Sequence, residues 1–198
     1  MTDQIPVTQR RAALSTLFQM IANVPGDIVE LGVASGATLR EWQRLVELDG
    51  TNRLVFGFDS FSGFPALSPE DGPEMIGIGK RVGGETELRP RPLRADEINH
   101  GLARLIVGDI CDTLPKMAQH LYPALVFCDA DLYAPTKVAL DLLWSRLPKG
   151  GLMIFDEYGH EAWPGETKAV DDFLSVNPRL VLERMDLPYG PTALIVKP

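Results

Sequence analysis

The spacing of apolar residues alternates along the chain between a helical period and short continuous runs. Over residues 12–21, apolar side chains recur every three or four positions, which predicts a helix with one buried face. A Pro-Gly break follows, and the mostly apolar run after it predicts a buried strand over 27–32. The same alternation further along predicts helices at 37–48, 96–102, 112–120, 133–146 and 167–174, and strands at 53–59, 103–109, 124–129 and 152–156.

This order of elements predicts the fold class. Short apolar strands that alternate with helices are typical of a parallel sheet covered on both faces. The last two strands, at 180–185 and 192–196, flank a turn with proline and glycine and are predicted to form an antiparallel hairpin. We therefore predict a single α/β domain over 1–198, with a doubly wound, mostly parallel seven-stranded sheet (Rossmann-like) and a C-terminal antiparallel hairpin.

Residues 60–94 break the alternation of helices and strands. This segment of 35 residues contains five prolines and six glycines, which disfavours a regular core element. A loop of this length inside a compact domain commonly covers a binding site. The segment is therefore predicted to be a lid or substrate loop.

The composition argues against several classes of protein. The net charge is −8, and no cluster of Lys and Arg is available to bind nucleic acid. No apolar run approaches the roughly 20 residues that span a membrane, and the N-terminal residues lack a secretory pattern. Cys111 and Cys128 have no metal-binding or redox spacing and are expected to be buried thiols of a reducing compartment. We expect a cytoplasmic protein whose partner is a small molecule; the oligomeric state stays open, a homo-oligomer included.

Acidic side chains stand at or near the predicted ends of the five parallel strands. Ligands of open parallel sheets bind outside the carboxyl ends of the strands. One acidic residue there is ordinary, because Asp commonly caps helices and turns. Several on one rim repel one another unless a cation or another ligand offsets their charge. The residues concerned are Glu30, Asp59, Asp109, Asp129, Asp156 and Glu157.

The first strand leads into a glycine-containing turn, ELGVASG, at residues 30–36. Two glycines at this spacing permit a sharp turn and close approach of the backbone to a ligand at a helix start. The spacing is neither G-x-G-x-x-G nor that of a P-loop, which weakens dinucleotide and nucleoside triphosphate interpretations. Asp59, at the end of the next strand, could accept hydrogen bonds from both hydroxyls of a ribose. Together the two features favour a nucleoside-containing cofactor without a pyrophosphate.

Seven short motifs occur in order along the chain. They are ELGVASG at 30–36, FDSFSGFP at 58–65, GDICDTLP at 108–115, DADLY at 129–133, PTKVAL at 135–140, PKGG at 148–151 and FDEYG at 155–159. With these motifs the chain resembles the macrocin O-methyltransferase (TylF) family, class I S-adenosylmethionine-dependent enzymes that methylate sugar hydroxyls in natural-product pathways. The resemblance covers roughly residues 27–174, and DADLY followed by FDEYG is its most specific part.

The resemblance implies S-adenosylmethionine as the cofactor. By this resemblance, the turn after the first strand contacts the methionine and ribose portions, the end of the second strand binds the ribose hydroxyls, and the end of the third frames the adenine. The residues implied, in that order, are Glu30, Gly32, Ser35 and Gly36; Asp59, Ser60 and Phe61; and Asp109 and Ile110.

The resemblance also implies a divalent cation, usually magnesium, held by Asp129, Asp156 and Glu157, with Asp131 as the general base. The residue types agree, because three carboxylates suit a hard cation better than zinc, which favours His and Cys. Asp129 and Asp131 would face one side if their strand continued past its end. The chain departs from the family in a short segment before residue 27 and in Glu157, where Asp is commoner.

The expected reaction is methyl transfer to a hydroxyl of a small molecule, a sugar or a natural-product intermediate. The cation would stabilise the developing alkoxide, Asp131 would take the proton, and residues 60–94 would exclude water. His160 and Trp163 follow the last parallel strand and are candidate substrate contacts.

Three alternatives stay open. A metal-dependent catechol or phenol methyltransferase would need the same cation and a flatter pocket. A nucleotide-sugar glycosyltransferase would use the D-x-D at 129–131 to hold a diphosphate, although Glu30 and Asp59 would repel that group. A non-catalytic cofactor-binding subunit would gain nothing from unpaired buried carboxylates.

Overall fold

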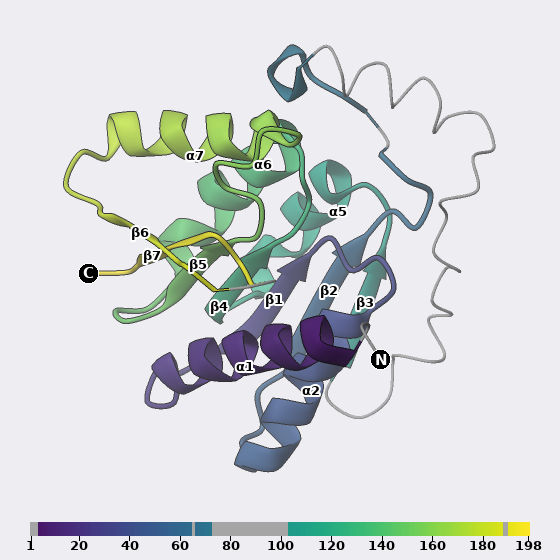
Figure 1. Ribbon diagram of the computed structural model, residues 1–198, viewed down its shortest axis with the longest axis vertical. Coiled ribbons are helices and arrows are strands. Elements are labelled where there is room, and N and C mark those ends of the chain that lie inside the picture. The colour runs from purple at the N-terminus through teal and green to yellow at the C-terminus, as the bar shows by residue number, and fades with distance from the viewer. Residues whose placement is uncertain (1–3, 65, 73–102, 188–189) are drawn as a thin grey trace.

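The computed structural model of the protein describes residues 4–64, 66–72, 103–187 and 190–198. Within these residues, the strands form one seven-stranded sheet in the order β3-β2-β1-β4-β5-β7-β6 (Figure 1). The first five strands pair in parallel, whereas β7 pairs antiparallel with both β5 and β6. The predicted fold class and C-terminal hairpin are therefore confirmed. The strands are β1 (Asp27–Leu31), β2 (Val55–Asp59), β3 (Ala103–Val107), β4 (Pro123–Cys128), β5 (Leu152–Phe155), β6 (Leu182–Arg184) and β7 (Ala193–Val196).

Helices cover both faces of this sheet. Helices α1 and α2 lie on one face, and α5, α6 and α7 lie on the other (Figure 1), each with apolar side chains in the core. Among the described helices, none is long and apolar enough to cross a membrane. The helices are α1 (Gln4–Met20), α2 (Ala37–Asp49), α5 (Ile110–Met117), α6 (Tyr133–Leu143) and α7 (Pro164–Val176), with short 3-10 helices η1 (Pro69–Asp71), η2 (Ala118–His120) and η3 (Trp144–Arg146).

The core consists of two apolar layers, one on each face of the sheet. On the α1/α2 face, Trp42 and Phe127 are fully buried, and their rings meet edge to face with centroids 5.8 Å apart. On the other face, Leu114, Leu140 and Val170 bring three helices onto the sheet. Each such side chain stabilises the fold by about 1.5–3 kcal/mol through burial. These layers hold the strand ends in fixed positions.

Three of the described helices, α1, α5 and α7, begin earlier than the sequence predicts. Helix α1 begins at residue 4, eight residues before the predicted start. The sequence did not predict these first turns because they carry exposed polar side chains, such as Thr8 and Gln9, and show no apolar period. Helix α5 begins at Ile110, where the carboxylate of Asp109 caps it by accepting a hydrogen bond from the Cys111 amide. The predicted helix at 96–102 and most of the predicted lid at 60–94 lie outside the described residues.

The strand order reverses between β1 and β4, and in open α/β sheets such a switch point is where ligands bind. Gly32 lies there, directly after β1, with φ of +90°. A Cβ atom at this position would lie 1.8 Å from the carbonyl oxygen of Asp129. The glycine therefore permits the ends of β1 and β4 to meet closely enough to bring their acidic residues together.

Gly32→Ala is expected to destabilise the protein by at least about 3 kcal/mol, because it adds a backbone clash to an unfavourable φ. Gly50→Ala is the matched control, since Gly50 has φ of +69° but no atom within 4 Å of the place that a Cβ atom would occupy. It should cost only about 1 kcal/mol. Urea unfolding of both variants measures the difference, and equal losses would refute the close approach at Gly32.

Candidate active site

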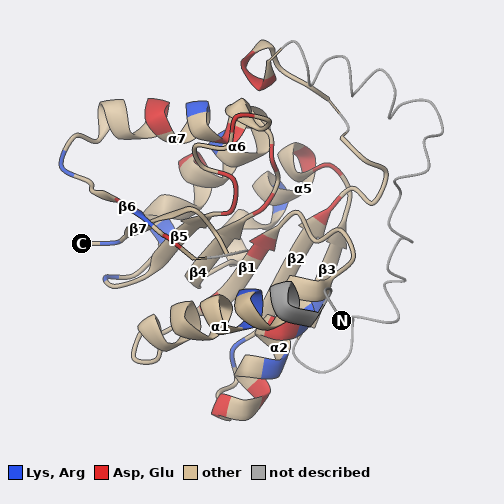
Figure 2. Ribbon diagram, viewed as in Figure 1, with Lys and Arg blue, Asp and Glu red and all other residues tan. Residues whose placement is uncertain are grey.

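Acidic residues occur at and beyond the carboxyl ends of the central strands (Figure 2). Glu30 lies in β1, Asp129 follows β4, and Asp156 and Glu157 follow β5. Electrostatic interactions link Glu30 with Asp129 and Asp156, and link Asp131 with Asp156 and Glu157. The sequence-predicted convergence of these residues on one rim is therefore present in the structure.

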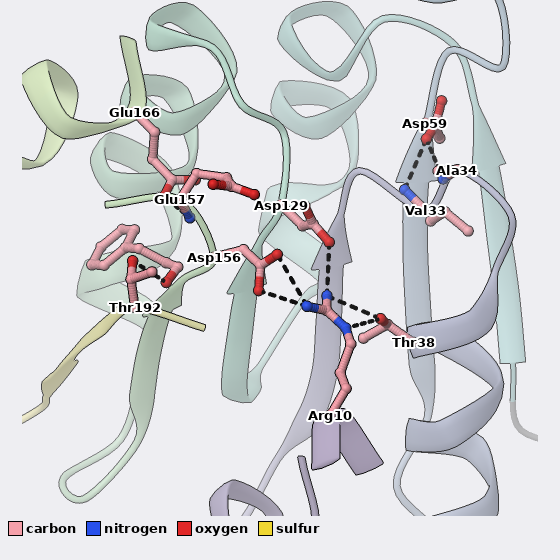
Figure 3. A network of polar contacts seen from close by, with 11 residues as sticks. Arg10, Val33, Ala34, Thr38, Asp59, Asp129, Asp156, Glu157, Glu166 and Thr192 are labelled. Atoms are coloured by element: carbon pink, nitrogen blue, oxygen red, sulfur yellow. Dashed lines mark hydrogen bonds and ion pairs between the residues drawn. The ribbon is translucent and has the colours of Figure 1, made fainter. Parts of the chain in front are cut away.

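The guanidinium of Arg10 lies in the middle of this group (Figure 3). Its Nη1 donates hydrogen bonds to both carboxylate oxygens of Asp156, at 3.1 and 3.2 Å, and its Nη2 donates to Oδ2 of Asp129 at 3.1 Å. Its Nε and Nη2 also donate to Oγ1 of Thr38, at 3.3 Å each. The guanidinium carbon lies 5.6 Å from the centroid of the Phe127 ring. Arg10 thus joins the ends of β4 and β5 to α1 and α2.

Sequence reasoning missed Arg10, although the chain carries a signal for it. Arg10 precedes Leu14 by four residues and Leu17 by seven, which places it on the face of α1 that packs against the sheet. A cationic residue in line with an apolar face points toward the core or toward a buried anion. The helix predicted from the apolar period begins at residue 12, which leaves Arg10 outside it.

The predicted metal ligands do not fit a divalent ion as they are arranged. Their oxygen donors are of the kind that Mg²⁺ prefers. In the described parts of the chain, however, no group of three or more His, Cys, Asp or Glu side chains is arranged to hold a metal ion. Asp129 and Asp156 are paired through Arg10, while the side chain of Glu157 lies 3.9 Å from Nδ1 of His160. Magnesium binding therefore stays a prediction.

Burial raises the pKa of several carboxyl groups at this rim. It raises the pKa of Glu30 well above its ordinary value; Arg10 partly offsets this, and Asp156 and Asp59 add to it. Although 27% of the Asp129 side chain is exposed, desolvation among its neighbours raises its pKa too, and the charge of Asp156 acts in the same direction. The rim as a whole favours a bound positive charge.

Glu30 is the most unusual of these groups. Its side chain has 0% exposure, and neither carboxylate oxygen has a hydrogen-bond partner among the described residues. Buried polar atoms in native proteins are almost always hydrogen-bonded, so an unpaired buried carboxylate indicates a missing partner. Glu30 lies near the end of β1, where it interacts electrostatically with Arg10, Asp156 and Asp59.

Asp59 holds the turn after β1 in place. Its Oδ2 accepts hydrogen bonds from the amides of Val33 and Ala34, both at 2.8 Å, and its Oδ1 accepts one from the amide of Phe61 at 2.7 Å (Figure 3). A carboxylate has about four acceptor sites, so Asp59 keeps capacity for a ribose hydroxyl. The ribose contact of Asp59 stays a prediction, and the structure adds that this side chain holds the turn after β1.

Asp131 has a left-handed backbone conformation. Its φ is +63°, a left-handed conformation uncommon outside glycine, asparagine and aspartate. Burial raises its pKa to about 7, and the charges of Glu157, Asp156 and Asp59 contribute. Because β4 ends at Cys128, strand alternation does not apply here. The left-handed turn, rather than a continuing strand, positions Asp131.

The remaining predicted cofactor residues have local structural roles. Gly36 caps α2 in a left-handed conformation, and Ser35 is exposed in the turn before it. The hydroxyl of Ser60 donates to the carbonyl of Gly63, and Phe61 packs against the core layer of α1 and α2. Asp109 and Ile110 respectively cap α5 and pack in the core. None of the described contacts tests their predicted role at the cofactor.

The candidate substrate residues lie at the start of α7. Trp163 packs edge to face against Phe64, with ring centroids 5.8 Å apart. His160 lines an open cleft of about 510 Å³ together with residues of η1 and α7, and this cleft contains none of the candidate carboxylates. The described start of the predicted lid, at 60–64, therefore contacts the segment before α7.

Two further buried acids were missed by sequence reasoning. Oε1 of Glu166, a side chain with 0% exposure, accepts a hydrogen bond from the amide of Glu157 at 2.8 Å. Oδ1 of Asp71 accepts one from the amide of Tyr133 at 2.7 Å, which fastens η1 to the start of α6. Glu166 shares the buried face of α7 with Ala169 and Val170, a spacing that could have predicted it.

The sheet order and the rim together define a class I S-adenosylmethionine-dependent methyltransferase fold. The solved structure of a calicheamicin methyltransferase superimposes with a TM-score of 0.73 at 25% identity, over 94% of this chain and 77% of that one. Residues 6–181 match the macrocin-O-methyltransferase (TylF) family model, and the chain belongs to this family.

Two curated relatives are similar in sequence. An 8-demethyl-8-(2,3-dimethoxy-alpha-L-rhamnosyl)-tetracenomycin-C 4'-O-methyltransferase of Streptomyces olivaceus is 33% identical over 70% of this chain and 55% of its own length. A mycinamicin III 3''-O-methyltransferase of Micromonospora griseorubida is 32% identical over 68% of this chain and 56% of its own. The chain therefore spans about half the length of these relatives.

Asp131→Asn is expected to stabilise the cofactor-free protein increasingly as pH rises. The folded-state pKa of about 7 exceeds the ordinary value of 3.8, so in the wild type the free energy of unfolding falls as pH rises between these values. Asn does not ionise and tolerates a positive φ. Chemical unfolding at pH 4 and pH 8 should show a relative gain of about 1–3 kcal/mol at pH 8.

Asp131→Ala provides the control for this comparison. It should show the same pH trend with a constant loss of about 1 kcal/mol, because alanine is strained in the left-handed region. A difference between wild type and Asp131→Asn that does not vary with pH would contradict the raised pKa.

Proposed function

We propose that the chain binds S-adenosylmethionine at the ends of β1 and β2 and transfers its methyl group to a hydroxyl of a small molecule. The unpaired, fully buried carboxylate of Glu30 is the observation that carries this proposal. S-adenosylmethionine has two positive centres, the ammonium and the sulfonium, and either would favour the ionised form of this buried carboxyl group. Membership of the TylF family supports the same cofactor.

The turn after β1 and Asp59 supply the rest of the cofactor site. The Asp59 carboxylate holds the amides of Val33 and Ala34, which fixes the backbone that a ligand would approach. Its free acceptor capacity suits the ribose hydroxyls. The acidic rim disfavours a diphosphate, which weakens the glycosyltransferase alternative.

Asp131 is the proposed general base. The acceptor oxygen attacks the methyl carbon in line, the carbon–sulfur bond breaks, and its electron pair neutralises the sulfonium. The hydroxyl proton passes to the Asp131 carboxylate, and the products are the methyl ether and S-adenosylhomocysteine. A base with a pKa near 7 is well matched to neutral pH. No step of this reaction is assigned to a metal ion.

The proposed acceptor is a sugar hydroxyl of a natural product or of its precursor. Both curated relatives are named as O-methyltransferases of glycosylated natural products. Trp163, held against Phe64, offers an aromatic surface at the same end of the sheet. Catechol or phenol methylation is the alternative that the acceptor test distinguishes.

Glu30→Gln is expected to weaken S-adenosylmethionine binding about tenfold to a hundredfold, the range for losing a charged hydrogen bond. Glu41→Gln is the matched control, because Glu41 is also buried but pairs with Arg11 of α1 and Arg44 of α2. Isothermal titration measures both. Unchanged affinity in Glu30→Gln, or no binding by the wild type, would overturn the cofactor assignment.

Turnover should test the acceptor class and the base together. With rhamnosylated polyketides as acceptors, turnover is measured as the formation of S-adenosylhomocysteine. The kcat of the wild type should rise as pH increases through about 7. Asp131→Asn should lower kcat by about 10²–10⁴ and remove this rise. Methylation of catechols alone would contradict the sugar assignment, and an unchanged pH profile in Asp131→Asn would contradict the base.

A further inference from the structure

We propose that Arg10 is the resident cation of the strand-end site, and that a divalent ion binds Asp129 and Asp156 only when Arg10 withdraws. The inference concerns the site of the proposed function but does not depend on methyl transfer. The proposal predicts that Arg10, a residue of helix α1, determines how tightly this site binds a divalent ion.

The first support is the completeness of the Arg10 contacts. Its Nη1 contacts both oxygens of Asp156, its Nη2 contacts Asp129, and its Nε contacts Thr38. All three guanidinium nitrogens therefore donate hydrogen bonds, and two of them contact carboxylates, which gives charge-assisted hydrogen bonds. The ring of Phe127 lies against the same group. The guanidinium is therefore fixed between the two carboxylates.

The second support is the competition for the same oxygens. A magnesium ion lies about 2.0–2.1 Å from its carboxylate ligands. An ion bridging Asp129 and Asp156 would share oxygens that Arg10 contacts at 3.1 Å. Two cations at that separation repel strongly in a partly buried site. We therefore expect the ion and the Arg10 guanidinium to compete for these oxygens.

The third support is that Arg10 can leave without unfolding α1. Leu14 and Leu17, one and two turns further along, are almost fully buried and anchor the helix. The Arg10 side chain itself is 28% exposed, which gives it a path to solvent by rotation about its own bonds. Exchange between Arg10 and an ion therefore needs only a side-chain movement.

Manganese titration without cofactor or acceptor tests the proposal. Binding is measured by isothermal titration and by the electron paramagnetic resonance signal of free Mn²⁺. Arg10→Gln should bind the ion at least about tenfold more tightly than wild type. Arg11→Gln is the matched control, because neighbouring Arg11 pairs with Glu41 away from the site. It should bind Mn²⁺ as the wild type does. Equal or weaker binding by Arg10→Gln would overturn the proposal.

Thermal unfolding provides a second measurement. Without Arg10 the two carboxylates lack a counter-charge, so Arg10→Gln should melt below wild type in EDTA and recover with MgCl₂, while wild type shifts little. Arg10→Lys, which keeps the charge but loses the planar fork, should give an intermediate Mn²⁺ affinity if Arg10→Gln fails to fold. Competition would be refuted if Arg10→Lys bound Mn²⁺ with the affinity of the wild type and MgCl₂ did not restore the melting temperature of Arg10→Gln. Cofactor titration of the same variants separates this result from the proposed function.

Discussion

Repulsion between carboxylates held close together is the constraint on which this site depends. Backbone pairing of β1 with β4 and of β4 with β5 fixes Glu30, Asp129 and Asp156 at one end of the sheet. The protein accommodates their charge in three ways. Arg10 pairs with Asp129 and Asp156, burial favours the protonated form of Glu30, and backbone amides donate hydrogen bonds to the neighbouring Asp59. Neither carboxylate oxygen of Glu30, which is fully buried, has a hydrogen-bond partner among the described residues.

The fold was predictable because its determinants are local. Continuous apolar runs indicated the parallel strands, and the Pro/Gly turn indicated the hairpin. The convergence of the strand-end acids followed from topology alone, since parallel strands present their carboxyl ends at one edge. Element boundaries were less predictable, because Asp109 caps α5 and the polar start of α1 has no period to read.

The details of the site depend on contacts between residues far apart in sequence. Arg10 meets Asp129 and Asp156 across 119 and 146 residues, so no local motif reports the pairing. The DADLY motif predicted that its two aspartates face one side of a continuing strand. In the structure, a left-handed backbone conformation at Asp131 sets the position of its side chain instead. Asp59 likewise has a task within the protein, holding the turn at Val33 and Ala34, that its place at a strand end did not reveal.

The participation of α1 bears on where the domain can be shortened. By hydrophobic pattern the first helix starts at residue 12, and a truncation there would keep Leu14, Leu17 and the whole sheet. Such a fragment would retain the buried apolar side chains of α1. It would nevertheless lack the guanidinium that joins Asp129 to Asp156, and its strand ends would carry one positive charge fewer. The residues that complete this charged network therefore begin before the hydrophobic boundary of the domain, within the first turns of α1.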